Sequence, residues 1–130
     1  MIAIDSNVVL RLILGDDPVQ LDSVIDAMAR DTFFVPLTVF LEAGWVLQSR
    51  YRMSRNETAD ALAALLELSG VEVARPALAD WAINRYRAGA DLGDVVHLVA
   101  AAKHDIFLTF DRKLKAKAGR HSPVPIETLT

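Results

Sequence analysis

Four acidic residues that are far apart in the sequence stand where strands are predicted to end or helices to begin. Asp5 and Asp111 each follow a short apolar stretch of the kind that forms a buried strand. Glu42 and Asp94 lie near the starts of predicted helices, and Asp91 precedes Asp94 by three residues. In parallel α/β sheets ligands bind beyond the carboxyl ends of the strands, so these acids are expected to meet in one crevice.

Carboxylates gathered in one crevice require protons or cations. Four charges about 6 Å apart, at an effective dielectric constant of about 20, repel by ~2.8 kcal/mol per pair and ~17 kcal/mol in all. That is comparable with or larger than the ~5–15 kcal/mol stability of a domain. The chain has no cysteine, and a set of oxygen ligands favours Mg²⁺ or Mn²⁺ over Zn²⁺. Such ions activate water and stabilise the attacking and leaving oxygens, so the pattern predicts phosphodiester hydrolysis.

Each acid taken alone also has a purely structural interpretation. Asp5 could cap the helix that follows it, and Asp111 could cap the basic helix after it. One of Asp91 and Asp94 could cap the helix that begins beside them. Glu42 could lie on a solvated helix face, although it stands in a strongly apolar segment. The functional interpretation therefore depends on the acids being close together.

Other polar side chains near these acids are less informative. His97, three residues after Asp94, is expected in the core rather than at the rim of the crevice. The segments Arg50-Tyr51-Arg52 and Arg85-Tyr86-Arg87 could contact RNA through phosphate pairing and base stacking. Solvated helix ends would explain them equally well.

The composition predicts one soluble domain over residues 1–130, with 52% hydrophobic and 24% charged residues. The net charge of −3 argues weakly against broad non-specific binding of nucleic acid. If the five acids lie in one metal-filled pocket, removing their charges from −3 leaves +2 for the rest of the chain. No apolar run is long enough for a membrane span, and the first residues do not resemble a signal peptide. We expect a cytoplasmic protein.

Strand and helix patterns alternate along the chain, which predicts a parallel sheet covered by helices on both faces. Strands are predicted at 2–4, 33–35, 71–73, 106–108 and 125–127, and helices at 8–14, 18–30, 38–50, 58–68, 76–89, 95–102 and 112–117. The strand at 106–108 is expected to be buried.

Several helix boundaries carry local signals. Asp17 followed by Pro18 predicts an N-cap and a first helical residue, and Gly15 ends the preceding helix. Thr38 is the predicted cap of the next helix, and Ser54 with Glu57 forms a capping-box pattern. The buried stripe of the helix after Pro18 is expected to consist of Val19, Leu21, Val24, Ile25 and Met28.

Four motifs in order along the chain resemble those of PIN domains, most closely the VapC-type toxins of bacterial toxin–antitoxin pairs. They are Ile4-Asp5-Ser6-Asn7-Val8-Val9, Phe40-Leu41-Glu42-Ala43, Asp91-Leu92-Gly93-Asp94 with the apolar helix after it, and Thr109-Phe110-Asp111. The resemblance covers almost the whole chain, and it rests on the combination because no single motif is specific.

The resemblance implies a three-layer α/β/α sandwich with a central five-stranded parallel sheet. It also implies a Mg²⁺- or Mn²⁺-dependent endoribonuclease that hydrolyses RNA through an acidic quartet. Carried over by position, the quartet is Asp5, Glu42, Asp94 and Asp111. The implied metal ligands are Asp5, Asp94 and Asp111, with Asp91 as an additional acid found in part of the family.

Two neighbouring polar residues, Asn7 and Thr109, are implied to support the acids. Gly93 departs from the family pattern, because glycine is a poor helix former. Its presence between the two acids leaves open whether Asp91 lies in the helix or in the loop before it.

The resemblance further implies a homodimer and a cognate antitoxin that lays a segment, often with an arginine, into the acidic pocket. A housekeeping PIN nuclease that matures ribosomal RNA is the alternative within the family. A phosphoacceptor receiver domain is a third hypothesis, but Ser6 and Asn7 follow Asp5 where a receiver would have an acidic pair at the strand end. A non-catalytic binding module is disfavoured because all four acids are present.

Overall fold

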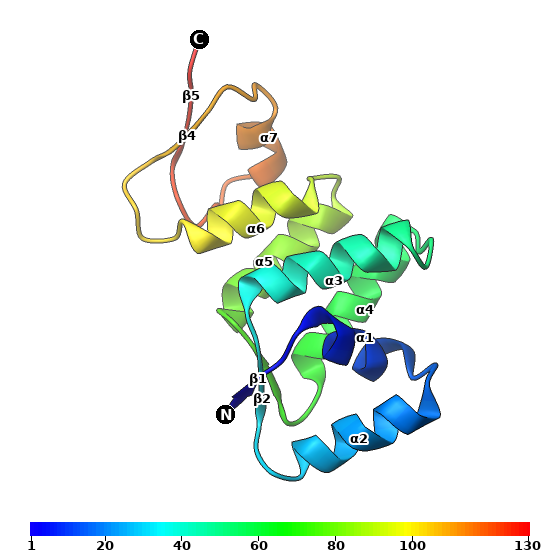
Figure 1. Cartoon of the computed structure of the whole chain (residues 1–130). Coiled ribbons are helices and arrows are strands. Elements are labelled where there is room, and N and C mark those ends of the chain that lie inside the picture. The colour runs from blue at the N-terminus through cyan, green and yellow to red at the C-terminus, as the bar shows by residue number, and fades with distance from the viewer. The chain divides into compact units, whose positions relative to one another are not determined.

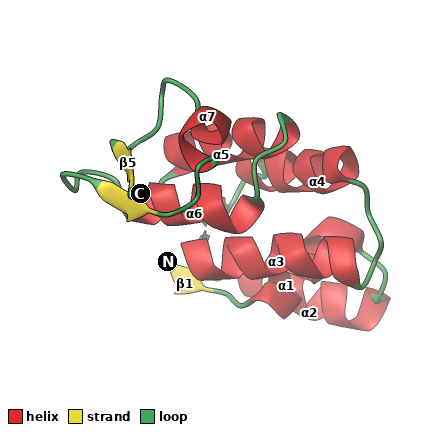
Figure 2. Ribbon diagram, turned by 90° about the horizontal axis from the view of Figure 1, so that it is seen from above, coloured by secondary structure: helices red, strands yellow, loops and turns green.

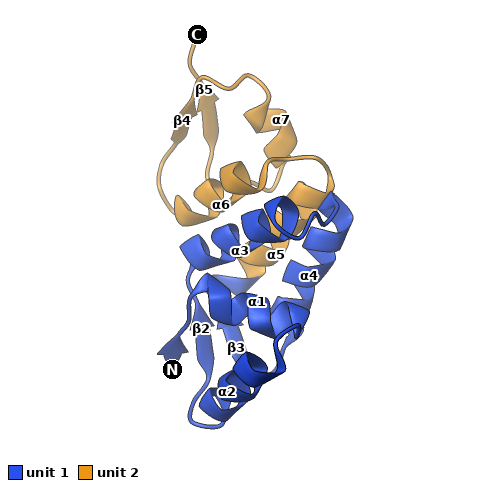
Figure 3. Ribbon diagram, turned by 45° about the vertical axis from the view of Figure 1, so that its right-hand side comes forward, with its two compact units in different colours: residues 1–76 blue, residues 77–130 orange.

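The computed structural model describes residues 1–130 as two compact units, Met1–Pro76 and Ala77–Thr130 (Figure 3). The first unit contains β1 (Ile2–Ala3), α1 (Ser6–Leu14), α2 (Pro18–Met28), β2 (Phe33–Val35), α3 (Leu37–Ser49), α4 (Arg55–Glu67) and β3 (Val71–Val73). The second contains α5 (Pro76–Arg87), which begins at the boundary, α6 (Leu92–Ala100), β4 (Phe107–Thr109), α7 (Leu114–Ala118) and β5 (Ile126–Thr128). The strands are short, and most of the regular structure is helical (Figure 2).

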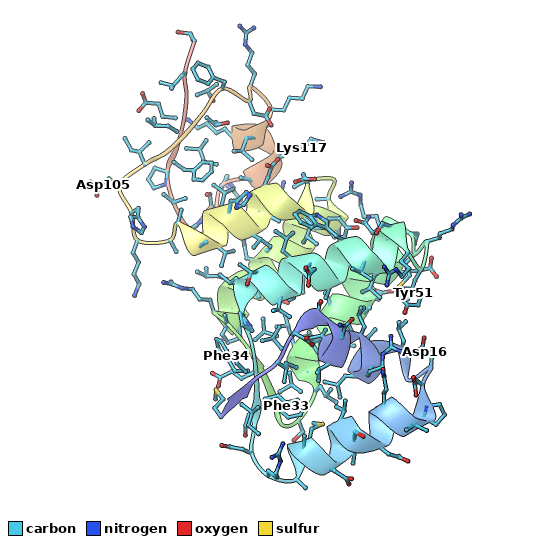
Figure 4. The ribbon with its side chains drawn as sticks, viewed as in Figure 1. Asp16, Phe33, Phe34, Tyr51, Asp105 and Lys117 are labelled. Atoms are coloured by element: carbon cyan, nitrogen blue, oxygen red, sulfur yellow. The ribbon has the colours of Figure 1, made fainter.

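The sheet of the first unit is parallel and has the order β1-β2-β3. Figure 1 shows β1 beside β2. Phe33 is the Cα partner of Ile2 on one side and of Val71 on the other. Side chains alternate between the two faces of β2, and Figure 4 shows Phe33 and Phe34 on opposite sides of the strand. Phe33 and Val35 are buried, so this face of the sheet contributes to the core of the unit.

The helix ends of the first unit follow the local chemistry predicted for them. The side chain of Asp17 accepts a hydrogen bond from the Gln20 backbone N–H, with Pro18 in the first turn of α2. Gly15 ends α1 in the left-handed conformation, at φ 58°. Before α4, Ser54 forms the predicted capping box with the residue at the third helical position.

Two predictions about the first unit are wrong. Helix α3 begins at Leu37 after Pro36, with no side-chain cap, so Thr38 lies inside the first turn. A proline at this boundary has no N–H to satisfy, and its φ of −60° leads directly into the helix. In α2 the apolar stripe is narrower than predicted, because Val19 is 77% and Ile25 is 52% exposed.

The second unit packs a two-stranded parallel sheet, β4-β5, on its helices. Its core consists of Leu98, Leu114, Ala118, Val124 and Ile126, with Trp81, Ala101 and Phe107 packed against it.

The prediction of a buried strand at 106–108 is wrong. Strand β4 begins one residue later, and Ile106 and Leu108 are 49% and 56% exposed. Alternation places Phe107 on the core while its two neighbours face away.

The strands form a three-stranded and a two-stranded sheet in place of the expected single five-stranded one. The fold is nevertheless α/β with parallel pairing throughout, as predicted. None of the helices has the length and apolar character needed to cross a membrane.

Candidate active site

Asp5 stands at the junction between β1 and α1. Ile4 is buried and anchors the end of the strand, while Asp5 itself is exposed. The Asp5 backbone is extended, and its carboxylate accepts a hydrogen bond of 3.1 Å from the Val8 backbone N–H. The capping interpretation of Asp5 is therefore confirmed. One carboxylate oxygen makes this hydrogen bond, and the other remains available to a cation or a substrate.

Glu42 lies in the second turn of α3 and is held toward the Asp5 region. Its neighbours Leu41 and Ala43 are buried, whereas Glu42 is exposed. The Ser6 hydroxyl donates a short hydrogen bond to the Glu42 carboxylate. Because Ser6 directly follows Asp5, this bond brings two of the four predicted acids to the same end of the first unit. Glu42 is exposed, as the interpretation of a solvated helix face predicts, and it also contacts Ser6.

Asp91 is the N-cap of α6. Its carboxylate accepts a hydrogen bond of 3.0 Å from the Asp94 backbone N–H, and its own backbone is extended. The helix begins at Leu92, and Gly93, which has no side chain, is buried in its first turn. The question raised by Gly93 is thus resolved: Asp91 lies just outside the helix and Asp94 inside it.

Asp94 is the acid whose environment is most altered. Burial raises its pKa above the ordinary value of 3.8, and the charges of Asp91 and Asp111 raise it further. The nearby His97 acts in the opposite direction. Asp91 and Asp111 therefore both lie within electrostatic reach of Asp94 inside the second unit. A divalent cation would relieve this repulsion.

Asp111 is held by its own turn. The Thr109 hydroxyl oxygen accepts a hydrogen bond of 3.0 Å from the Asp111 backbone N–H. The Asp111 carboxylate accepts one of 2.9 Å from the Lys113 backbone N–H. Helix α7 begins at Leu114 with Lys113 as its N-cap residue, so the prediction that Asp111 caps this helix is wrong. Thr109 thus contacts the backbone of the turn that carries Asp111.

Three expectations about other polar side chains are resolved. His97 is exposed on α6 and does not belong to the core, which corrects the prediction. Tyr86 is buried and so cannot stack on RNA, whereas Arg85 donates from Nε to the Lys117 carbonyl at 2.8 Å. Tyr51 is half-buried, and its hydroxyl accepts a hydrogen bond of 3.2 Å from another arginine, Arg11.

The donor set fits a hard divalent cation. All five acids offer oxygen ligands, and the acid with the raised pKa is crowded by two others. Asp5 and Glu42 belong to the first unit and the other three to the second. No group of three or more histidine or acidic side chains in the structure is arranged to hold a metal ion.

Sequence reasoning missed Ser6. Asn7, predicted as a supporting residue, is exposed, and its side chain makes no hydrogen bond within the protein. Ser6 instead makes the contact to Glu42. The available signal was its position in the first turn of a helix that begins at a strand-end acid. Its partner is 36 residues away, which a local pattern does not reveal.

Comparison with known protein families identifies the family of this chain. The model of the PIN domain matches residues 2–120, a range that runs through both units. No curated protein and no solved structure matches the chain. The five acids all lie within the matched range. The chain belongs to the PIN domain family, whose members are generally metal-dependent nucleases.

Proposed function

We propose that this protein is a Mg²⁺- or Mn²⁺-dependent endoribonuclease of the VapC type, which a cognate antitoxin neutralises. The observation that carries the proposal is the grouping of the predicted acids within each unit. The Ser6 hydroxyl holds Glu42 at the Asp5 end of α1, and Asp91 and Asp111 both act electrostatically on Asp94. The PIN family match supplies the nuclease class.

The carboxylates of Asp5, Asp94 and Asp111 would hold the cation, with Asp91 beside them. When bound, the ion would supply a Lewis acid for the scissile phosphate and its attacking water. Glu42, fixed by the Ser6 hydroxyl, would accept a proton or orient water at the rim of the site. Thr109 would fix the turn that presents Asp111.

Exposed groups of the second unit favour RNA as the substrate over a small phosphate ester. Phe110, directly before Asp111, is 73% exposed, and such an aromatic side chain can stack on an unpaired base. The basic residues that follow it are exposed and can contact phosphates, namely Arg112, Lys113, Lys115 and Lys117.

Cleavage of RNA tests the proposal directly. The purified protein should cleave single-stranded RNA in the presence of Mg²⁺ or Mn²⁺. Chelation of the ions with EDTA should stop the cleavage. Sequencing of RNA ends after brief expression should show new ends with the wild type and none with Asp5→Asn. Undiminished cleavage after thorough chelation would refute the metal dependence, and cleavage by Asp5→Asn at the wild-type rate would refute the site.

The housekeeping RNA-processing nuclease remains the alternative, and a neighbouring antitoxin gene separates the two. We propose a cytoplasmic homodimer for the toxin. Co-expression with the product of such a gene should abolish growth arrest. If the protein still cleaved RNA at its full rate when bound to that gene product, the housekeeping role would be favoured.

A further inference from the structure

A groove in the first unit leads away from Asp5 between β1 and α2. Its larger part has a volume of about 490 Å³, and its lining includes Ile4, Val8, Val24, Ala27 and Phe33. Phe33 and Val24 are buried members of the core, so the floor of the groove is a fixed apolar surface. Its volume is in the ~300–1,000 Å³ range of small-molecule sites.

The groove continues along α2 into a second hollow of about 330 Å³. Both hollows are lined by Asp5, Val8, Ser23 and Val24, and they therefore adjoin at the candidate catalytic carboxylate. The second hollow adds two side-chain amides, Asn7 and Gln20, which make no hydrogen bond within the protein. Free amides above an apolar floor can both donate to and accept from a ligand.

The charges around the groove favour a neutral occupant. Asp5 is the only ionisable side chain that lines the larger hollow. In the second hollow Arg11 is already engaged, because its guanidinium binds the Asp16 carboxylate at 2.9 Å and the Tyr51 hydroxyl at 3.2 Å. Figure 4 shows Asp16 and Tyr51 near each other. A phosphate or an acidic peptide would find no free cation here.

We propose that this groove receives one unpaired base of the RNA substrate, next to the phosphate that is cleaved. The inference rests on the proposed ribonuclease function and adds the specificity determinants of the same site. Aliphatic side chains would sandwich the base, and the Gln20 and Asn7 amides would read its edge. Ser23 donates its hydroxyl to the Val19 carbonyl at 3.3 Å, so its oxygen can still accept a hydrogen bond from the base.

The test compares cleavage of short unstructured RNAs that differ at one position beside the cleavage site. Ser23→Trp fills the groove from the exposed side of α2, and Gln20→Ala removes an amide without adding bulk. Ile25→Trp is the matched control, because Ile25 is exposed on the same helix but lines neither hollow. Thermal melts establish that each variant folds.

The wild type should prefer certain bases at one position by about tenfold, the size of one base contact. Ser23→Trp should reduce cleavage of the preferred RNA to the rate of the others. Gln20→Ala should narrow the preference, and Ile25→Trp should retain it. If Ser23→Trp and Ile25→Trp behaved alike, the inference would be overturned while the ribonuclease function stood.

A second measurement does not depend on catalysis. In the Asp94→Asn protein, binding of a single-stranded RNA should shift the NMR methyl signals of Val8, Val24 and Ala27. Unchanged methyl signals at saturating RNA would overturn the inference. So would a Ser23→Trp variant that cleaves RNA normally but no longer binds the antitoxin, because the groove would then belong to a protein partner. Absence of any RNA cleavage by the wild type would instead refute the proposed function.

Discussion

The Ser6 hydroxyl donates a hydrogen bond to the Glu42 carboxylate and thereby joins the first turn of α1 to α3. Helices α1 and α3 also pack against each other, so the bond sits on a fixed contact between two elements. One residue thus adjoins Asp5 in sequence and touches Glu42 in space. This relationship is the strongest link between the two candidate acids of the first unit.

Ser6→Ala should lower the rate of RNA cleavage. A hydrogen bond to a charged group contributes ~1.5–3 kcal/mol, which corresponds to about 10- to 100-fold in rate if the bond positions Glu42 in the transition state. Ser6→Thr retains the hydroxyl and should restore most of the activity. Measurement of kcat and KM should show the loss in kcat. A normal kcat for Ser6→Ala would mean that Glu42 needs no support from Ser6.

Substitutions of Asp5 should separate its two roles. Asparagine caps helices as well as aspartate does, so Asp5→Asn should retain the stability of α1 while losing cleavage. Asp5→Ala should lose cleavage and also about 1 kcal/mol of the free energy of unfolding. Urea unfolding monitored by circular dichroism measures the second effect. Equal stability of the two variants would show that the cap contributes nothing.

Asp94 should make the metal-free protein less stable as the pH rises. Its pKa is raised in the folded state, chiefly by burial, so the unfolded chain loses the proton first. Stability therefore falls as the pH increases from about 3.8 through the folded pKa. Asp94→Asn removes this cost and should melt at a higher temperature than the wild type at pH 7 in EDTA.

The control for the Asp94 prediction is to repeat the melts of both proteins at lower pH. The difference in melting temperature between Asp94→Asn and the wild type should shrink as the pH is lowered toward 3.8. Mg²⁺ at pH 7 should stabilise the wild type more than the variant. A wild type that is the more stable of the two at pH 7 without metal would contradict the assigned environment of Asp94.

Phe110 should contribute to RNA affinity through stacking. Removal of one base–aromatic contact costs ~1–3 kcal/mol of binding free energy. Phe110→Leu retains an apolar side chain but loses the ring, so it should bind single-stranded RNA more weakly, and Phe110→Trp should not. Because Phe110 is exposed, neither substitution should disturb the core. Fluorescence anisotropy in the non-cleaving Asp94→Asn background gives both dissociation constants, and equal values would exclude stacking.

Local chemistry made several elements predictable from sequence. The Asp17-Pro18 start and the Ser54 capping box are complete within four residues, and both are present in the structure. The strands at 33–35 and 71–73 have the predicted limits because short runs of aromatic and β-branched side chains lie next to turn-forming residues, Pro36 after the first and Gly70 before the second. Acids at strand ends could be found in the same way.

Features that depend on distant partners could not be predicted. The Ser6–Glu42 bond joins positions 36 residues apart. Val19 and Leu108 are exposed because α2 and β4 each bury only a narrow face. The apolar character of a residue does not reveal the width of the buried face. The pairing of β4 with β5 likewise depends on tertiary contacts rather than on the strand pattern itself.

The central claim is that the predicted carboxylates of this PIN domain bind one divalent ion. Anomalous diffraction from crystals of the full chain grown with Mn²⁺ tests it most directly. We predict a Mn²⁺ peak coordinated by Asp5 together with Asp94 or Asp111, with Glu42 beside it, and no peak there for Asp94→Asn. A Mn²⁺ ion bound without any of these carboxylates, or Asp5 on the opposite side of the molecule from Asp94 and Asp111, would contradict it.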